Sequence, residues 1–257
     1  MPRWIGAFFV VFGAMSDKIG RRPVYIVGAV GIGIWGSSNV TIYNAKVSYC
    51  WGDGIYLGQA NSLINCKNIN IQSPWLKKNR RSGLSVTGVD GLLIDNLYSG
   101  YSDGTSPFSG INFEPNNSTS EFKNVRINNP KTESNKNGIQ ISARNMLATT
   151  DKYLDITIVN HTDIGSTRYP FKVSCNPTID ITAKLYGLIK IANPSWQRTA
   201  TETNVYLWLS SNQVNLKTAI TSPEIINTSG VMLSWTDTYN LLIKAAIGGV
   251  LTVTQAL

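Results

Sequence analysis

The sequence lacks the residue sets from which most metal centres and nucleophilic triads are built. It has one histidine, His161, and three cysteines, Cys50, Cys66 and Cys175, whose wide spacings fit no metal site. An odd number of cysteines gives no disulfide framework, and Cys66 is interpreted as a small buried residue. We therefore expect no metal, no cofactor and no Ser-His-Asp triad, which leaves His161 only as a lone acid or base.

Charged residues and long apolar runs are also scarce. Charged side chains make up 15% of the 257 residues, and no run of Lys and Arg alternates with aromatic residues, so a nucleic-acid partner is not expected. The net charge of +8 is compatible with an acidic partner such as a uronic-acid polysaccharide. Residues 4–15 and 24–35 are apolar, but each run has about 12 residues, where a transmembrane helix takes about 20.

What the chain has in excess is a short repeat between about residues 37 and 191. Its clearer half is a glycine that starts a short strand pattern, and successive glycines are 29, 27 and 28 residues apart: Gly54, Gly83, Gly110 and Gly138. A second alternating segment precedes each glycine: residues 39–42, 68–71, 91–94 and 124–127. Such alternation puts every second side chain on one face of a strand. Units of 20 to 50 residues that contain strands predict an all-β solenoid with parallel strands.

A column of asparagines supports this fold. Two positions after the last apolar residue of the earlier segment come Asn44, Ser73, Asn96, Asn129 and Asn160. Asparagine tolerates the left-handed backbone conformation of a sharp turn. Stacked coils bring equivalent residues about 4.8 Å apart, which allows their amides to hydrogen-bond. The sequence therefore predicts an asparagine ladder at one corner of the solenoid.

Residues 1–35 fall outside the repeat and form an apolar and basic N-terminal segment. Within it, residues 13–23 (GAMSDKIGRRP) resemble the loop between the second and third transmembrane helices of major facilitator superfamily transporters. The rest of a transporter is missing, so we expect no transport, and membrane contact only through this segment. A recombined gene start is favoured over a membrane-associating hairpin or a signal peptide. Residues 36–192 are expected to form the solenoid. Residues 193–257 are expected to form a β-rich cap, a small domain or a region through which three chains assemble into a homotrimer.

Two motifs carry a further resemblance. Residues 79–86 (NRRSGLSV) and 109–116 (SGINFEPN) are similar to motifs found one coil apart in right-handed parallel β-helix proteins of the pectate-lyase-like superfamily, which includes phage tailspikes. The resemblance implies a right-handed, single-stranded parallel β-helix. It also implies a polysaccharide-binding and polysaccharide-degrading protein, a hydrolase or a lyase, located outside the cell, on its surface or in a phage virion. The alternatives are a non-catalytic glycan-binding or structural module and, more weakly, a transporter-related fragment.

The sequence departs from these relatives in three ways. Asn112 stands where they commonly have Asp, the catalytic motif of the related epimerases is absent, and the earlier coils that such proteins usually carry are missing. The first difference removes a carboxylate from the outer face, and the second gives epimerase activity no support. The third leads us to expect a truncated relative.

The outward residues of the glycine-led strands are expected to form a polar column that suits the hydroxyls of a sugar chain. The residues predicted to bind substrate are Tyr56, Arg80, Ser85, Asn112, Gln140 and Arg144. Glycoside hydrolysis uses two carboxyl groups about 5 to 9.5 Å apart, for which we propose Glu114 and, on an insert of the same coil, Asp103. Lyase chemistry needs a base and a cation, and Arg80, Arg81 or Arg144 can supply the cation, with Arg81 as the predicted catalytic residue. Asp53, two coils away, is expected to lie more than about 10 Å from Glu114.

Overall fold

The computed structural model describes residues 30–146, 150–175 and 183–197, together with six strands between residues 205 and 254. The transporter-like residues 13–23 lie outside this description. Across the described residues, no helix has the length and apolar character needed to cross a membrane. Most of what is described is β-strand, joined by turns and one short 3-10 helix, η1 (Arg144–Met146).

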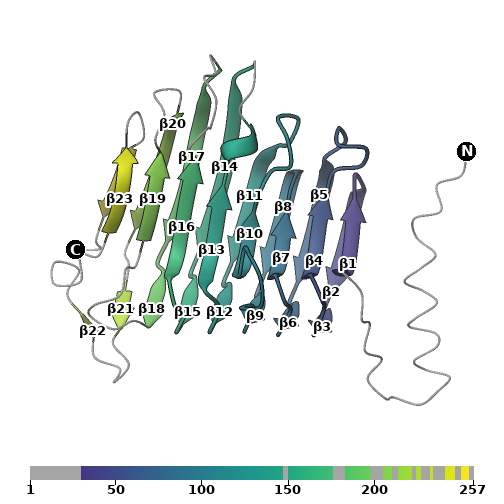
Figure 1. Cartoon of the computed structure of the whole chain (residues 1–257), viewed down its shortest axis with the longest axis horizontal. Helices are drawn as coiled ribbons and strands as arrows, with labels where there is room; N and C mark the ends of the chain where they lie inside the picture. The colour runs from purple at the N-terminus through teal and green to yellow at the C-terminus, as the bar shows by residue number, and fades with distance from the viewer. Residues whose placement is uncertain are drawn as a thin grey trace, which may run out of the picture.

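The strands form three eight-stranded sheets that run along the solenoid (Figure 1). Sheet A contains β1 (Val30–Trp35), β4 (Asp53–Gly58), β7 (Ser82–Val86), β10 (Ser109–Phe113), β13 (Asn137–Ser142), β16 (Tyr169–Cys175), β19 (Val205–Leu209) and β23 (Leu241–Ala246). Sheet B contains β2 (Ser38–Tyr43), β5 (Cys66–Gln72), β8 (Val89–Asp95), β11 (Phe122–Asn128), β14 (Lys152–Val159), β17 (Leu185–Ala192), β20 (Val214–Thr221) and β24 (Val250–Thr254). Sheet C contains β3 (Lys46–Ser48), β6 (Trp75–Lys77), β9 (Tyr98–Gly100), β12 (Lys131–Glu133), β15 (Thr162–Ile164), β18 (Ser195–Gln197), β21 (Glu224–Ile226) and β22 (Met232–Leu233).

Each coil contributes one strand to each sheet in turn, and neighbouring strands within a sheet are parallel. The antiparallel pair of β21 and β22 is the exception among the described strands. This arrangement confirms the predicted all-β parallel solenoid.

Sheet A confirms the predicted alignment of the glycine-led segments. Ile55 pairs with Leu84, Leu84 with Ile111, and Ile111 with Ile139, so the apolar residues stack in one row. The alternation predicts two strands per repeat, whereas the structure has a third, three residues long, in sheet C. Strands β6 and β9 begin the segments that lie between the two predicted strands of their coils, residues 75–81 and 98–107.

The asparagine ladder is also confirmed. Asn96, Asn129 and Asn160 all have positive φ angles, 55°, 51° and 56°, in the left-handed region. The Nδ2 of Asn129 donates to Oδ1 of Asn96 at 3.1 Å, and that of Asn160 donates to Asn129 at 2.9 Å. Asn193 extends the ladder by donating to Asn160 at 3.3 Å. The same residue type thus makes the turn and links successive coils.

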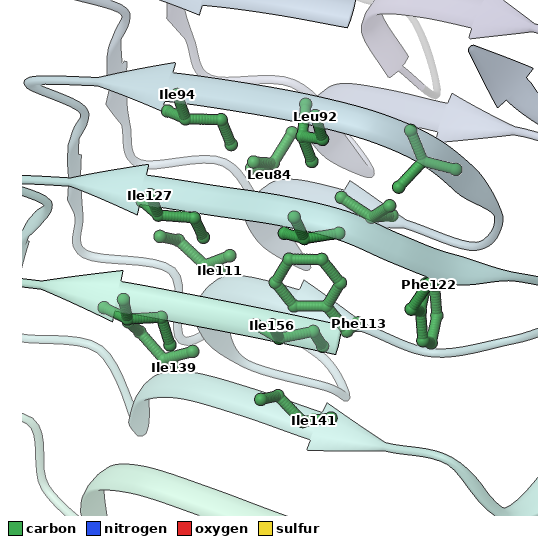
Figure 2. Close-up of a cluster of buried hydrophobic side chains, with 14 of the residues drawn as sticks. Leu84, Leu92, Ile94, Ile111, Phe113, Phe122, Ile127, Ile139, Ile141 and Ile156 are labelled. Carbon is green, nitrogen blue, oxygen red and sulfur yellow. The ribbon is translucent and has the colours of Figure 1, made fainter. Parts of the chain in front are cut away.

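The core lies between the sheets, where apolar side chains of successive coils stack (Figure 2). Leu84, Ile111 and Ile139 point inward from sheet A and are fully buried. The ring of Phe113 in sheet A meets that of Phe122 in sheet B edge to face, with centroids 5.4 Å apart. Burying a large apolar side chain stabilises a fold by roughly 1.5–3 kcal/mol, so these columns are a major source of stability.

The sheets extend past both ends of the expected solenoid. Strand β1 lies within residues 1–35 and pairs in parallel with β4. Beyond residue 193, β19 pairs with β16, β20 with β17, and β21 with β18, all in parallel. The strands of the C-terminal region therefore continue the same three sheets.

Candidate functional site

The outward column of sheet A lies side by side in the register that alternation predicts. Tyr56 is paired with Ser85, Ser85 with Asn112, Asn112 with Gln140, and Gln140 with Lys172. We call these five residues the sheet A strip. Because neighbouring strands lie about 4.8 Å apart, the strip presents a regular row of polar side chains from five successive coils.

Glu114 follows β10 directly, and its carboxylate is directed at the strip. The Nδ2 of Asn112 donates to Oε2 of Glu114 at 3.1 Å. Further along, Nζ of Lys172 donates to Oε1 of Gln140 at 3.2 Å. Burial lowers the pKa of Lys172, the charge of Arg168 lowers it further, and the charge of Glu114 raises it. A carboxylate and an ammonium group therefore influence each other along this face.

Sheet A also holds most of the buried polar atoms that have no hydrogen-bond partner. Among the described residues seven side-chain oxygens are in this position, and five of them belong to strands of sheet A: Asp53 Oδ1, Ser82 Oγ, Ser85 Oγ, Asn112 Oδ1 and Asn137 Oδ1. A buried polar atom without a partner costs roughly 1–3 kcal/mol. In native proteins such atoms usually bind ordered water or a ligand. Their concentration in four adjacent strands therefore marks this sheet as the candidate site.

Asp53 is the residue of this region that the sequence interpretation did not select. It lies at the start of β4, is 1% exposed, and one of its oxygens is 3.7 Å from Nη1 of Arg81. Burial raises the pKa of Asp53, while the charge of Arg81 lowers it. The Ser85 hydroxyl and the Ser82 backbone N–H also lower it, although the Ser85 hydroxyl makes no hydrogen bond to the carboxylate. The charge of Glu114 also contributes to raising it. The charge of Glu114 therefore reaches Asp53, while the separation of more than about 10 Å expected from the sequence stays a prediction.

The other predicted site residues lie around this face. Asp103 is exposed on the loop between β9 and β10, and among the described contacts no hydrogen bond or ion pair joins it to Glu114. Arg81 Nε donates to the carbonyl oxygen of Ser106 in the same loop at 3.2 Å, which ties that loop to sheet A. Arg144 is exposed in η1. Its neighbour Asn145 donates to the carbonyl oxygen of Pro115 at 3.1 Å, which holds η1 beside the turn that carries Glu114.

His161, the candidate lone acid or base, lies in the interior and away from this surface. The Nε1–H of Trp196 donates to Nδ1 of His161 at 3.2 Å, which leaves Nε2 as the protonated nitrogen. That nitrogen donates to the Thr132 hydroxyl at 2.8 Å, and the hydroxyl donates to Oδ2 of Asp163 at 2.6 Å. Burial lowers the pKa of His161 to about 3. A neutral, fully buried imidazole with both nitrogens bonded acts in folding rather than in catalysis.

The thiols contribute no site. Cys50, Cys66 and Cys175 are free and buried, and burial raises the pKa of each, to about 12 for Cys175. Such thiols stay protonated and unreactive at neutral pH. Across the part of the chain that the structure describes, no group of three or more His, Cys, Asp or Glu side chains is arranged to hold a metal ion.

Two curated proteins of Bacillus subtilis (strain 168) are similar to part of this chain. SPbeta prophage-derived uncharacterized protein YorA is 32% identical over 94 residues, which cover 33% of this chain and 16% of that protein. Uncharacterized protein YclG is 33% identical over 92 residues, which again cover 33% of this chain and 16% of the relative. The similarity thus spans about a sixth of the length of either relative. No solved structure matches the chain significantly.

A family model described as a right-handed β-helix region matches residues 30–160, which make up half of the chain. The matched region covers strands β1 to β14 and includes the sheet A strip as far as Gln140. The match agrees with the parallel stacking of all three sheets. On both grounds, this chain belongs to the right-handed β-helix family.

Proposed function

We propose that this chain binds an extended polysaccharide across the sheet A strip and cleaves it there, outside the cell, on its surface or in a phage virion. The observation that carries the proposal is the set of partnerless polar atoms in β4, β7, β10 and β13. Sugar hydroxyls both donate and accept hydrogen bonds, so a glycan chain satisfies such a row without specific charges. A repeating ligand also suits a surface that itself repeats with every coil.

Aromatic rings near both ends of the strip support a sugar ligand. The rings of Trp35 and Tyr56 lie 5.9 Å apart at one end, and those of Tyr169 and Tyr206 lie 5.0 Å apart at the other. An aromatic ring offers a rigid apolar face together with a polar edge. The less polar face of a pyranose packs against such a ring while its hydroxyls bind the polar centre of the strip.

The proposed chemistry is hydrolysis with two carboxyl groups, Glu114 and Asp53, which requires them to lie within about 9.5 Å of each other and thus closer than the sequence predicts. Glu114 contacts the centre of the strip through Asn112, and Asp53 lies at the end of the strip that carries Tyr56. Burial raises the pKa of the Asp53 carboxyl, the direction that suits a general acid, and Glu114 is then the base or nucleophile. In the alternative lyase reaction, Arg81 would stabilise the negative charge that develops at a uronate carboxylate, whereas the oxocarbenium-like transition state of hydrolysis develops positive charge.

One observation favours a second function, glycan binding without cleavage. Both carboxylates already have partners in the protein, because Glu114 accepts from Asn112 and Asp53 pairs with Arg81. A surface built only for recognition needs no free acid or base. The experiment below separates the two functions.

The test incubates the full chain with a panel of neutral and acidic polysaccharides and follows reducing ends together with the absorbance of unsaturated sugar ends. Reducing ends alone indicate a hydrolase, both signals indicate a lyase, and binding without products indicates a recognition module. We expect Glu114→Gln to lower cleavage about 10²- to 10⁴-fold, as loss of an acid or base does. Asp155→Asn, on the outer face of β14 in sheet B, is the matched control and keeps full activity. An unchanged rate in Glu114→Gln would remove Glu114 from the reaction.

A further inference from the structure

A pocket with a volume of about 430 Å³ lies at the Tyr56 end of the sheet A strip. Strands β1 and β4 line it, together with the turns that precede β4 and β7. Its size falls within the roughly 300–1,000 Å³ of typical small-molecule sites. Three kinds of side chain meet there: aromatic rings, guanidinium groups and one buried carboxylate.

The aromatic wall is made possible by two glycines. Trp35 folds back over the outer face of sheet A, and a methyl group at Gly33 would overlap its indole ring. At Gly58 a methyl group would lie 2.9 Å from Cδ1 of the same ring. The indole therefore lies flat against β1 and β4, next to Tyr56, and is still 43% exposed. A flat, accessible ring beside a polar strip is a platform on which one sugar ring can stack.

Trp51 forms a second aromatic surface, and it is 64% exposed. The guanidinium carbon of Arg80 lies 4.1 Å from the centre of the Trp51 ring. This cation–π contact holds the guanidinium at the pocket while its N–H donors stay in solvent. Arg81, with 42% of its side chain exposed, adds a second guanidinium.

The carboxylate of Asp53 lies at the base of these groups. One oxygen pairs with Arg81 at 3.7 Å, whereas Oδ1 is buried and has no hydrogen-bond partner. An ionised carboxylate oxygen can accept two hydrogen bonds, so Oδ1 is an acceptor without a donor. A ligand hydroxyl would supply that donor.

The charges of the pocket favour an anion at its rim. Two guanidinium groups face one carboxylate, which leaves one positive charge in excess. A guanidinium binds a carboxylate through two parallel hydrogen bonds, which a neutral hydroxyl cannot reproduce. A ligand that satisfies the whole pocket therefore carries a ring that stacks, a hydroxyl that donates and a carboxylate that accepts.

We infer that this pocket is a subsite for one carboxylate-bearing pyranose, whose ring stacks on Trp35, whose hydroxyl donates to Asp53 and whose carboxylate binds Arg80. The inference rests on the proposed function, because it places one unit of the same polysaccharide. It adds a binding site at one end of the strip and a preference for acidic over neutral chains.

The test measures binding of the full chain to oligomers of polygalacturonate, alginate and hyaluronan by calorimetry. Each oligomer is compared with its carboxyl-reduced form, which is neutral but otherwise the same sugar chain. We expect the acidic form of at least one oligomer to bind about tenfold more tightly than its reduced form, since the carboxylate makes a charge-assisted pair.

Two variants locate the site. Arg80→Gln changes an exposed side chain, and we expect it to remove the preference for the acidic form while binding of the reduced form stays the same. Asp53→Leu removes the hydroxyl acceptor and weakens both forms. Arg126→Gln, which removes an exposed arginine from β11 in sheet B, is the matched control and leaves both affinities unchanged. Circular dichroism establishes that each variant is folded.

Each outcome decides between the two proposals. Equal binding of acidic and reduced oligomers, or an unchanged preference in Arg80→Gln, would overturn the inference and leave the proposed function standing. If Asp53→Leu is unfolded, Arg80→Gln still decides. If the chain binds no oligomer and the polysaccharide panel described above also gives neither binding nor products, the proposed function and the inference are both wrong.

Discussion

The polar network around His161, in the interior, and the sheet A strip, on the outer face, are built from the same stacked coils, yet their polar atoms differ in whether they have hydrogen-bond partners. In the network, Thr132, His161 and Trp196 pass hydrogen bonds from one coil to the next and end on Asp163. In the strip, Ser85 and Asn112 keep buried oxygens without partners. Buried polar groups in the His161 network therefore have hydrogen-bond partners, whereas these two oxygens of the sheet A strip lack them.

This difference separates polar residues that stabilise the solenoid from those available to a ligand. A satisfied buried network adds stability, and breaking it leaves several groups unpaired at once. An unpaired buried oxygen costs stability, so removing it costs little and can even stabilise the fold. Residue type alone does not make this distinction, because both regions consist of hydroxyl, amide and carboxyl side chains.

The largest effect is expected from breaking the network at its centre. Thr132→Val keeps the shape of the side chain but leaves the His161 ring and the Asp163 carboxylate each without one bond. We expect the free energy of unfolding to fall by about 4 kcal/mol, because two buried polar groups lose a partner. Urea unfolding measures this free energy, and Thr162→Val, in strand β15 of the same sheet C, is the control. A loss below about 1 kcal/mol would show that the network does not stabilise the fold.

A slightly smaller loss in the free energy of unfolding is expected when the pH is lowered. Burial lowers the pKa of His161 to about 3 from an unfolded value of 6.5, so between these values the unfolded chain binds a proton that the folded chain does not. The stability from the neutral imidazole is therefore complete above pH 6.5 and is lost as the pH falls. At about 1.4 kcal/mol per pH unit, the loss is roughly 3 kcal/mol at pH 4.

The pH effect is isolated by comparing the wild-type chain with His161→Gln, which cannot titrate. Unfolding free energies from pH 7.5 to pH 4 should fall more steeply for the wild-type chain, and the difference in slope belongs to His161. Parallel curves for the two proteins would mean that His161 is accessible to protons in the folded state.

The smallest effect on stability is expected in the strip. Ser85→Ala removes a buried hydroxyl oxygen that has no partner, so we expect the free energy of unfolding to change by less than about 0.5 kcal/mol. Ser99→Ala is a matched control, because this equally buried hydroxyl donates to the carbonyl oxygen of Gly110 at 3.0 Å and its loss should cost about 1 kcal/mol. Glycan binding should respond in the reverse order, weakening only in Ser85→Ala. Equal stability losses would contradict the distinction between the two regions.

The parts of the fold that the sequence predicts are those where the backbone restricts the residue type. A left-handed corner favours asparagine, so the ladder was recognisable in the sequence as a column that ends at Asn160. The structure extends this ladder to Asn193. Alternation over at least four residues revealed sheets A and B. The three-residue strands of sheet C are too short to show a period, and beyond residue 193 the glycine and asparagine markers are absent.

The candidate site was predictable only where it lies on a regularly alternating strand. Outward alternation placed Tyr56, Ser85 and Asn112 in one row, as the register of sheet A shows. The importance of Asp53 was missed because it precedes the glycine of its strand, where the turn from sheet C sets the direction of the side chain. Trp51 lies in that same turn, so no periodic signal pointed to the pocket.

The insert between β9 and β10 shows how such a molecule can change over evolutionary time. It has eight residues, 101–108, where the equivalent turn between β6 and β7 has four, 78–81, yet Ser82, Ser109 and Asn137 on either side of it remain in register. Length variation is therefore absorbed where coils turn, while the rows on each face keep their spacing. Duplication of one coil of about 28 residues would add a single place to the row and leave the others unaltered, so the length of the proposed binding surface can grow in whole units.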